Sequence, residues 1–233
     1  MTPLQMQAYF ELEIAKIDEL EKPQSEDIFY FINQAARKFV KTRYSGVNPK
    51  SEGFEQTQKR MDDLRTLVKE ARLVPYTPVI SGMGAKPYAK PHSCYVVLPD
   101  NYFVTLGEEV DISFTSMCGG TKTERVGITE CTVDTYTMKV ADPNEMHRLH
   151  MDNAWPLRLY LEGDIWLITD GNYTIPYYYL TYLAFPGTIY VGSTVDLPIH
   201  THEEVVKIAV DMYLENISDQ RVKTYPTQVG TME

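Results

Sequence analysis

The N-terminal third of the chain repeats apolar and polar positions with the period of an amphipathic helix. After Pro23, apolar side chains recur three and four residues apart, which places them on one face of a helix. These are Ile28, Phe29, Ile32, Ala35, Ala36, Phe39 and Val40. Ser25 starts the pattern, and Glu26 and Asp27 favour the positive end of the helix dipole. The pattern predicts a helix from Ser25 to the residue before Gly46.

Two further helices are predicted on either side of this one. Thr2, Pro3 and Gln5 form a capping box with proline in the first turn, so a helix is expected from there to about Glu21. A third helix is predicted over residues 54–72, and residues 45–53 form the loop before it. Its apolar positions are Phe54, Met61, Leu64, Leu67, Val68 and Ala71.

From Val74 onward, frequent prolines together with Val, Tyr, Thr and Phe favour extended chain. Residues 93–116 are predicted to form short strands separated by turns at PDN and GEE, and residues 123–139 one or two more. A brief helix is expected near residues 142–150.

The clearest strand pattern lies in residues 156–186. Leu157, Leu159 and Leu161 alternate with polar residues up to the turn EGD, and residues 165–168 form the returning strand. TDGN then turns into a further strand. Pro176 has no N–H to donate to a ladder, so this strand is predicted to be an edge strand or to be bulged there.

These elements predict an α+β fold, in which the N-terminal helices and a C-terminal helix form a helical bundle and a mostly antiparallel β domain is inserted between them. The predicted boundaries are 1–73 for the N-terminal helical part and 74–196 for the inserted β domain. Residues 197–220 form the C-terminal helix, which packs on the helical part. Residues 221–233 have little apolar content, so this tail is expected to be disordered alone or ordered on a neighbour.

The chain is acidic, with 22 Lys and Arg against 32 Asp and Glu in 233 residues, a net charge of -10. This balance works against wrapping duplex DNA, since such binding gains free energy when basic side chains replace phosphate counterions. An acidic surface suits either a soluble particle or the wall of a passage through which DNA slides.

Compartment and redox state follow from simple features. The three cysteines, Cys94, Cys118 and Cys131, lack CxxC spacing and are interpreted as reduced thiols. The N-terminal segment has acidic residues where a signal peptide needs an apolar run, and no stretch approaches the ~20 apolar residues of a membrane span. The chain is therefore expected to be made in a cytoplasm and to have no membrane partner.

His200 and His202 are the first candidate metal ligands, at the start of the predicted C-terminal helix. Thr201 and Glu204 fit a capping box there, so the helix start explains these residues without a metal. The HExxH pattern of zinc hydrolases also fails, because Val206 stands where the second histidine would be. A helix start is the favoured interpretation.

His147 and His150 are the second candidate pair, one helical turn apart, with Glu145 or Asp152 as a further ligand. A solvated short helix is favoured over a metal site.

Other chemistry has little support in the sequence. GGTKTE at Gly119 and SGMGAK at Ser81 lack the order of a phosphate-binding loop and are predicted to be ordinary loops. Neither a GxSxG elbow nor a local Cys-His signature occurs. No catalytic, cofactor-binding or metal residue is assigned, and no cofactor is expected.

Tyrosine is unusually frequent, with 17 residues. Six of them fall between residues 173 and 190: Tyr173, Tyr177, Tyr178, Tyr179, Tyr182 and Tyr190. A tyrosine-rich sheet suits a protein interface, because the ring buries a large apolar area and keeps a polar tip. Ordinary cross-strand pairing within the sheet explains the same residues equally well.

Three segments carry a family resemblance. They are FEQTQKRMDDLRTLV, DGNYTIPYYYLTYLAFP and LPIHTHEEVVKIAVDMYLENISDQR, which together make up about a quarter of the chain. They resemble structural proteins of crAss-like phages of Bacteroidales, the ring or adaptor proteins beneath the portal. The order of helices, inserted β domain and returning helix is also similar to the head-to-tail adaptors of short-tailed phages.

The resemblance implies a virion structural protein and not an enzyme. It implies a ring of twelve copies that binds under the portal, contacts other tail or ring proteins and surrounds the channel through which double-stranded DNA passes without sequence-specific binding. Two alternatives stay open: a second ring or stopper lower in the tail, and a metal-dependent enzyme that uses the histidines above. We also hypothesise that residues 221–233 and 45–53 become ordered on neighbouring chains.

Overall fold

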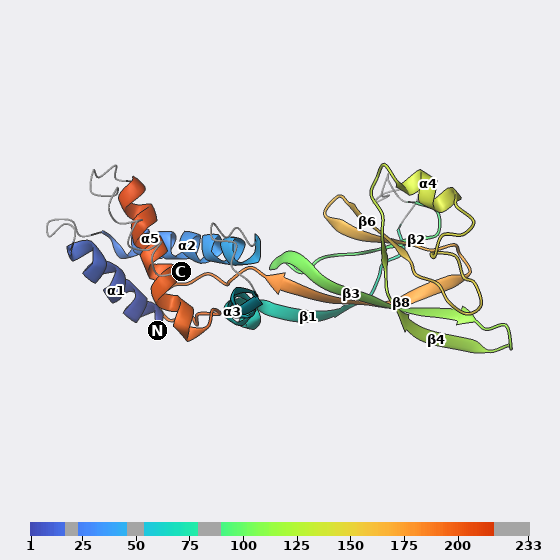
Figure 1. Cartoon of the computed structure of the whole chain (residues 1–233), viewed down its shortest axis with the longest axis horizontal. Helices are drawn as coiled ribbons and strands as arrows, with labels where there is room; N and C mark the ends of the chain where they lie inside the picture. The colour runs from blue at the N-terminus through green and yellow to red at the C-terminus, as the bar shows by residue number, and fades with distance from the viewer. Residues whose placement is uncertain (17–22, 46–53, 79–89, 217–233) are drawn as a thin grey trace. The chain divides into compact units, whose positions relative to one another are not determined.

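The computed structural model describes residues 1–16, 23–45, 54–78 and 90–216. The chain divides into two compact units, a helical unit from Met1–Val68 and Ala184–Glu233 and a β unit from Lys69–Leu183 (Figure 1). The predicted α+β class is confirmed, because N-terminal helices pack with the C-terminal helix and two mainly antiparallel sheets lie between them in the sequence. The predicted domain boundaries remain a proposal, since compactness does not test whether either part folds alone.

Among the described residues, the helical unit contains three N-terminal helices and one C-terminal helix. They are α1 (Pro3–Ala15), α2 (Ser25–Ser45), α3 (Phe54–Leu64) and α5 (His202–Asn216), with short 3-10 turns η1 (Arg65–Leu67) and η2 (Ile199–Thr201). The main contacts of α5 are with α2 and α1. The apolar stripe predicted for α2 is buried, and it faces a core that includes Val205, Val206 and Ala209 of α5.

Local signals set the helix starts as predicted. Thr2 caps α1, because its side chain accepts from the Gln5 N–H while the Gln5 side chain accepts from the Thr2 N–H. The second helix spans the predicted range, with Glu26 and Asp27 in its first turn. The predicted end of the first helix at Glu21 lies outside the described residues, as do residues 46–53 of the predicted loop and the tail from 221.

The third helix is shorter than predicted. It ends at Leu64, and residues 68–72, expected to continue it, belong to strand β1 (Val68–Leu73). Leu64 and Leu67 are buried as expected, but Met61 and Val68 are exposed. Pairing with another strand therefore overrides a helical pattern in which both Val68 and Ala71 fitted the stripe.

The described part of the β unit contains two four-stranded sheets. The first has the order β1-β8-β3-β4, with β8 (Tyr173–Ala184), β3 (Tyr102–Thr115) and β4 (Thr121–Val126). The second has the order β2-β7-β6-β5, with β2 (Ser93–Val96), β7 (Asp164–Ile168), β6 (Leu157–Leu161) and β5 (Thr129–Glu130). The β6–β7 hairpin is confirmed, pairing Leu157 with Ile168 and Leu161 with Asp164.

Two predictions for this unit are wrong, and one of the two alternatives for Pro176 is excluded. The GEE segment is not a turn but lies within β3, where Glu108 gains a partner on the other sheet. Residues 142–150 are not helical; the helix is α4 (Tyr136–Ala141), just before them. Its residues Tyr136 and Val140 pack on a buried cluster around Trp166. Pro176 is not on an edge strand, because β8 lies between β1 and β3, and the alternative of a bulge at Pro176 stays a prediction.

Candidate functional site

A hollow in the β unit is lined by residues of both sheets. It has a volume of about 530 Å³. We call it the β3–β6 hollow and define it by six lining residues: Tyr102, Thr105, Leu106, Glu108, Arg158 and Tyr160. The first four come from the first half of β3 and the last two from β6, so its shape depends on how the two sheets are held together.

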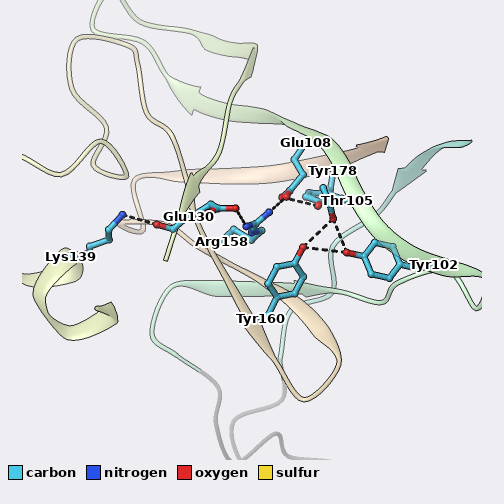
Figure 2. Close-up of polar contacts among 8 residues, drawn as sticks. All are labelled: Tyr102, Thr105, Glu108, Glu130, Lys139, Arg158, Tyr160 and Tyr178. Atoms are coloured by element: carbon cyan, nitrogen blue, oxygen red, sulfur yellow. Dashed lines mark hydrogen bonds and ion pairs between the residues drawn. The ribbon is translucent and has the colours of Figure 1, made fainter. Parts of the chain in front are cut away.

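Arg158 joins the two sheets in this hollow. Its Nη1 donates to Glu108 of β3, and its Nη2 donates to Glu130 of β5 (Figure 2). The second carboxylate oxygen of Glu108 accepts from the Tyr178 hydroxyl at 3.0 Å. The side chains of Arg158 and Glu108 are only 11% and 8% exposed. A buried carboxylate with both oxygens satisfied is stable only while these partners stay in place.

On one side of the hollow, the hydroxyl groups of Tyr102, Thr105 and Tyr160 form a triangle of hydrogen-bonding contacts. The Thr105 hydroxyl lies 2.8 Å from the Tyr102 hydroxyl and 3.0 Å from the Tyr160 hydroxyl (Figure 2). The Arg158 guanidinium lies 4.7 Å from the centroid of the Tyr160 ring. Burial raises the pKa of Tyr160, which therefore stays a neutral hydroxyl. The rings are held in one orientation and present a preorganised surface.

A second exposed feature lies at the far end of β3. The Asp152 carboxylate accepts from the Ser116 hydroxyl at 2.7 Å and from the Met117 N–H at 3.3 Å. Its bond from Ser116 holds the pKa of Asp152 below its usual value. The contact joins the β3–β4 turn to the turn at residues 150–153. Gly119 and Gly120 lie in the β3–β4 turn with φ of 80° and 96°, so the GGTKTE segment supplies the end of this hairpin turn and the first residues of β4.

Two methionines project from these joined turns. Met117 is 84% exposed and Met151 is 77% exposed. Met151 has φ 49° and Asp152 has φ 64°, a left-handed conformation that is uncommon for non-glycine residues. The His150–Asn153 backbone pair closes this turn. We call Met117 and Met151, clamped by Asp152, the methionine knob.

The helical unit has its own polar cluster. Arg43 of α2 pairs with Asp63 of α3, with its Nε 3.2 Å from Oδ2, and with Glu204 of α5. The imidazole Nε2 of His200 lies 2.8 Å from the Asp63 Oδ1. Asp63 is buried, so this cluster ties three helices together and gives His200 a structural partner.

His202 has different hydrogen-bond partners from His200, so the two imidazoles do not share a site. Its Nδ1 accepts from the Met1 ammonium at 2.9 Å, and its Nε2 donates to the Leu197 carbonyl at 2.8 Å. Desolvation lowers the pKa of His202, which favours this neutral imidazole. The helix begins at His202 as predicted. The two side chains predicted to form its capping box have other partners, because the Thr201 hydroxyl donates to the Pro198 carbonyl and Glu204 pairs with Arg43.

The other histidine pair is not the solvated helix that was favoured. His147 is buried, its carbonyl accepts from the Tyr173 hydroxyl at 2.8 Å, and desolvation lowers the pKa of its imidazole. His150 is exposed, and both residues lie outside any helix. Within the described ranges, no three His, Cys, Asp or Glu side chains are grouped so that they could hold a metal ion.

Most of the clustered tyrosines make their contacts within the β unit. The rings of Tyr173, Tyr178 and Tyr182 are buried. Arg72 lies over Tyr177, with its Cζ 3.5 Å from the ring centroid, and Arg125 lies over Tyr179 at 3.7 Å. Contacts within the unit therefore explain these five, whereas Tyr190 of the helical unit is exposed.

The sequence did not indicate the hollow or the knob. Arg158 and Glu108 are fifty residues apart, and Asp152 and Ser116 are thirty-six apart, so neither pair leaves a local motif. The carboxylate of Asp152, a candidate metal ligand, accepts instead from the Ser116 hydroxyl and the Met117 N–H. The segment SGMGAK at Ser81 lies outside the described residues.

Comparisons with known proteins give the family. No helix in the described part of the chain is both long and apolar enough to cross a membrane. A comparison with curated proteins gives no match. A family model described as phage tail ring protein 3/4 matches residues 6–223. The matched range includes both sheets and all the described helices except the first residues of α1. The chain therefore belongs to the crAss-like phage tail ring protein 3/4 family, a family of structural proteins.

Proposed function

We propose that copies of this chain form a closed ring in the phage tail, coaxial with the channel through which DNA passes. The observation that carries the proposal is the family match over both units. A ring made by cyclic repetition requires each subunit to present two different surfaces, one to each neighbour. By analogy with connector proteins, we propose twelve copies.

The charge supports passage of DNA without tight binding. The net charge of -10 repels phosphate, and a wall that repels the duplex lets it slide. The expected partners are therefore other copies of the chain, adjoining tail proteins and duplex DNA held without sequence-specific contacts.

The neighbours along the tail axis define two forms of this proposal. In the first, the ring binds directly under the portal as a head-to-tail adaptor. In the second, it meets another ring lower in the tail, which the family description as a tail ring protein favours. The chemistry of the ring is the same in both forms, but the coaxial partner differs.

Electron microscopy of reconstituted mixtures separates the two forms. Purified chain is mixed with portal protein in one sample and with the other tail proteins in a second. A joint ring complex with the portal supports the adaptor, and a complex formed only with tail proteins supports the lower ring. If neither mixture contains rings of this chain, the proposed function is wrong. Stoichiometric metal in the purified chain would instead favour the enzyme alternative.

A further inference from the structure

The β unit carries both a projection and a hollow. The methionine knob extends two exposed thioether side chains, and the β3–β6 hollow offers a space lined in part by the Tyr102 and Tyr160 rings and Leu106. A ring of identical chains needs two such complementary features on different parts of each chain. The inference below rests on the proposed ring and concerns how neighbouring copies contact each other.

Hydrogen bonds fix the backbone of the methionine knob. Asp152 bonds the neighbouring turn through Ser116 and the Met117 N–H, and the left-handed backbone at Met151 is fixed by the closed turn. These contacts keep two large apolar side chains in solvent, where they gain nothing in a single chain. Exposed methionines are adaptable and fit apolar or aromatic surfaces on a partner.

The hollow has the size and chemistry to receive them. Its volume of about 530 Å³ far exceeds the ~150 Å³ cavity that takes up a benzene molecule in other proteins. Leu106 is 47% exposed and Tyr160 is 43% exposed, so apolar and aromatic surface is available for contact. Methionine sulfur packs favourably against aromatic rings, and the hydroxyl triangle fixes the Tyr102 and Tyr160 rings for such contacts (Figure 2).

The two features are too far apart to meet within one chain. The hollow is lined by the start of β3, and the knob follows its end. At about 3.4 Å per residue, the strand from Thr105 to Ser116 spans roughly 37 Å. Figure 1 shows β3 running along the β unit toward the turn that leads into β4. Neither feature is therefore covered by the other within one chain.

We propose that Met117 and Met151 of one chain insert into the β3–β6 hollow of the next chain, and that this repeated contact closes the ring. A second copy is the occupant that the structure favours, because every copy carries one knob and one hollow. Repetition then covers all of them in equal number. A different partner on either feature would leave the other exposed around the whole ring.

Cys118 provides a native probe of this contact. It is exposed beside Met117, whereas Cys131 is buried and burial raises the pKa of Cys94 to about 12. Purified tails carrying Leu106→Cys are treated with a short bismaleimide and separated on a denaturing gel. We expect a ladder of covalently linked chains. The ladder should be lost with Cys118→Ser, and it should be absent when Met138→Cys on α4, a 76% exposed position, replaces Leu106→Cys.

Tails that contain the chain as a ring but give no ladder would overturn the inference and leave the proposed function intact. Absence of any ring of this chain would overturn both. A second measurement uses Met117→Lys combined with Met151→Lys, which should reduce incorporation of the chain into tails at least tenfold. The matched control Met138→Lys should leave incorporation unchanged. Equal incorporation of the wild type, the control and the double variant would contradict the inference.

Discussion

Arg158 on β6 donates to Glu108 on β3, so one buried ion pair joins the two sheets of the β unit. Tyr178 from β8 donates to the same carboxylate. The ion pair thus sets both the packing of the sheets and the floor of the β3–β6 hollow.

The substitution Arg158→Met should destabilise the β unit by about 3–5 kcal/mol, because it leaves the Glu108 carboxylate buried without its main partner. Urea unfolding followed by circular dichroism measures this change. The double variant Arg158→Met with Glu108→Leu should recover most of the loss, since it removes both charges.

A matched control tests whether burial is the cause. Arg125 pairs with Asp111 on the first sheet, but the Arg125 side chain is half exposed. Arg125→Met should therefore cost much less than Arg158→Met. Equal losses for the two variants would contradict the role given to burial.

Removing one tyrosine hydroxyl should cost more when its acceptor is charged. Tyr178→Phe removes a bond to the Glu108 carboxylate and should cost about 1.5–3 kcal/mol. Tyr173→Phe removes a bond of similar length to the His147 carbonyl and should cost about 0.5–1.5 kcal/mol. Both rings are buried, so they are matched in packing. The reverse order of unfolding free energies would contradict this account.

Loss of the clamp should loosen the knob without unfolding the β unit. Asp152→Ala removes the acceptor for the Ser116 hydroxyl and the Met117 N–H, so the Met117 amide should exchange with solvent several-fold faster. Glu109→Gln removes an exposed carboxylate elsewhere on β3 and serves as the control. Unchanged exchange at Met117 in the Asp152 variant would show that the clamp does not hold this turn.

The helical unit should lose stability as the pH falls below histidine's usual pKa of ~6.5. His202 is buried as a neutral imidazole, and its folded pKa is lowered by desolvation. The unfolded chain therefore binds a proton more readily, and unfolding becomes more favourable as the pH falls from ~6.5 toward the lowered folded pKa. Urea midpoints at pH ~7.5 and ~5.5 measure the effect.

His202→Gln removes the titrating group and should reduce this pH dependence. His200→Gln is the comparison, because His200 lies at the same helix start but its side chain is about half exposed. An identical pH dependence in the wild type and the His202 variant would contradict the prediction.

The elements predicted well are those with a signal within a few residues. The apolar stripe of α2 and the alternation around Leu157 predict their elements, because the apolar side of each is buried. The capping box at Thr2 predicts the start of α1, because its hydrogen bonds join residues three apart. The helix prediction for residues 68–72 is wrong because their helical spacing competes with strand pairing, which only the folded sheet supplies. The GEE segment was misassigned because Glu108 has its partner fifty residues away.

The candidate surfaces could not be predicted for the same reason. Nothing near Met117 shows that it projects into solvent, since that depends on Asp152 from another turn. His147 was expected to be solvated, but Tyr173 and the surrounding chain bury it. The family resemblance in three segments, in contrast, was confirmed by the match over residues 6–223.

The most direct test of the central claim is a cryo-electron microscopy map of intact tails of the phage that encodes this chain. We expect density for this chain in a closed ring around the DNA channel, with each copy contacting an identical copy on both sides. A map in which the chain is absent from the tail, or is present only as isolated copies without like neighbours, would contradict the account.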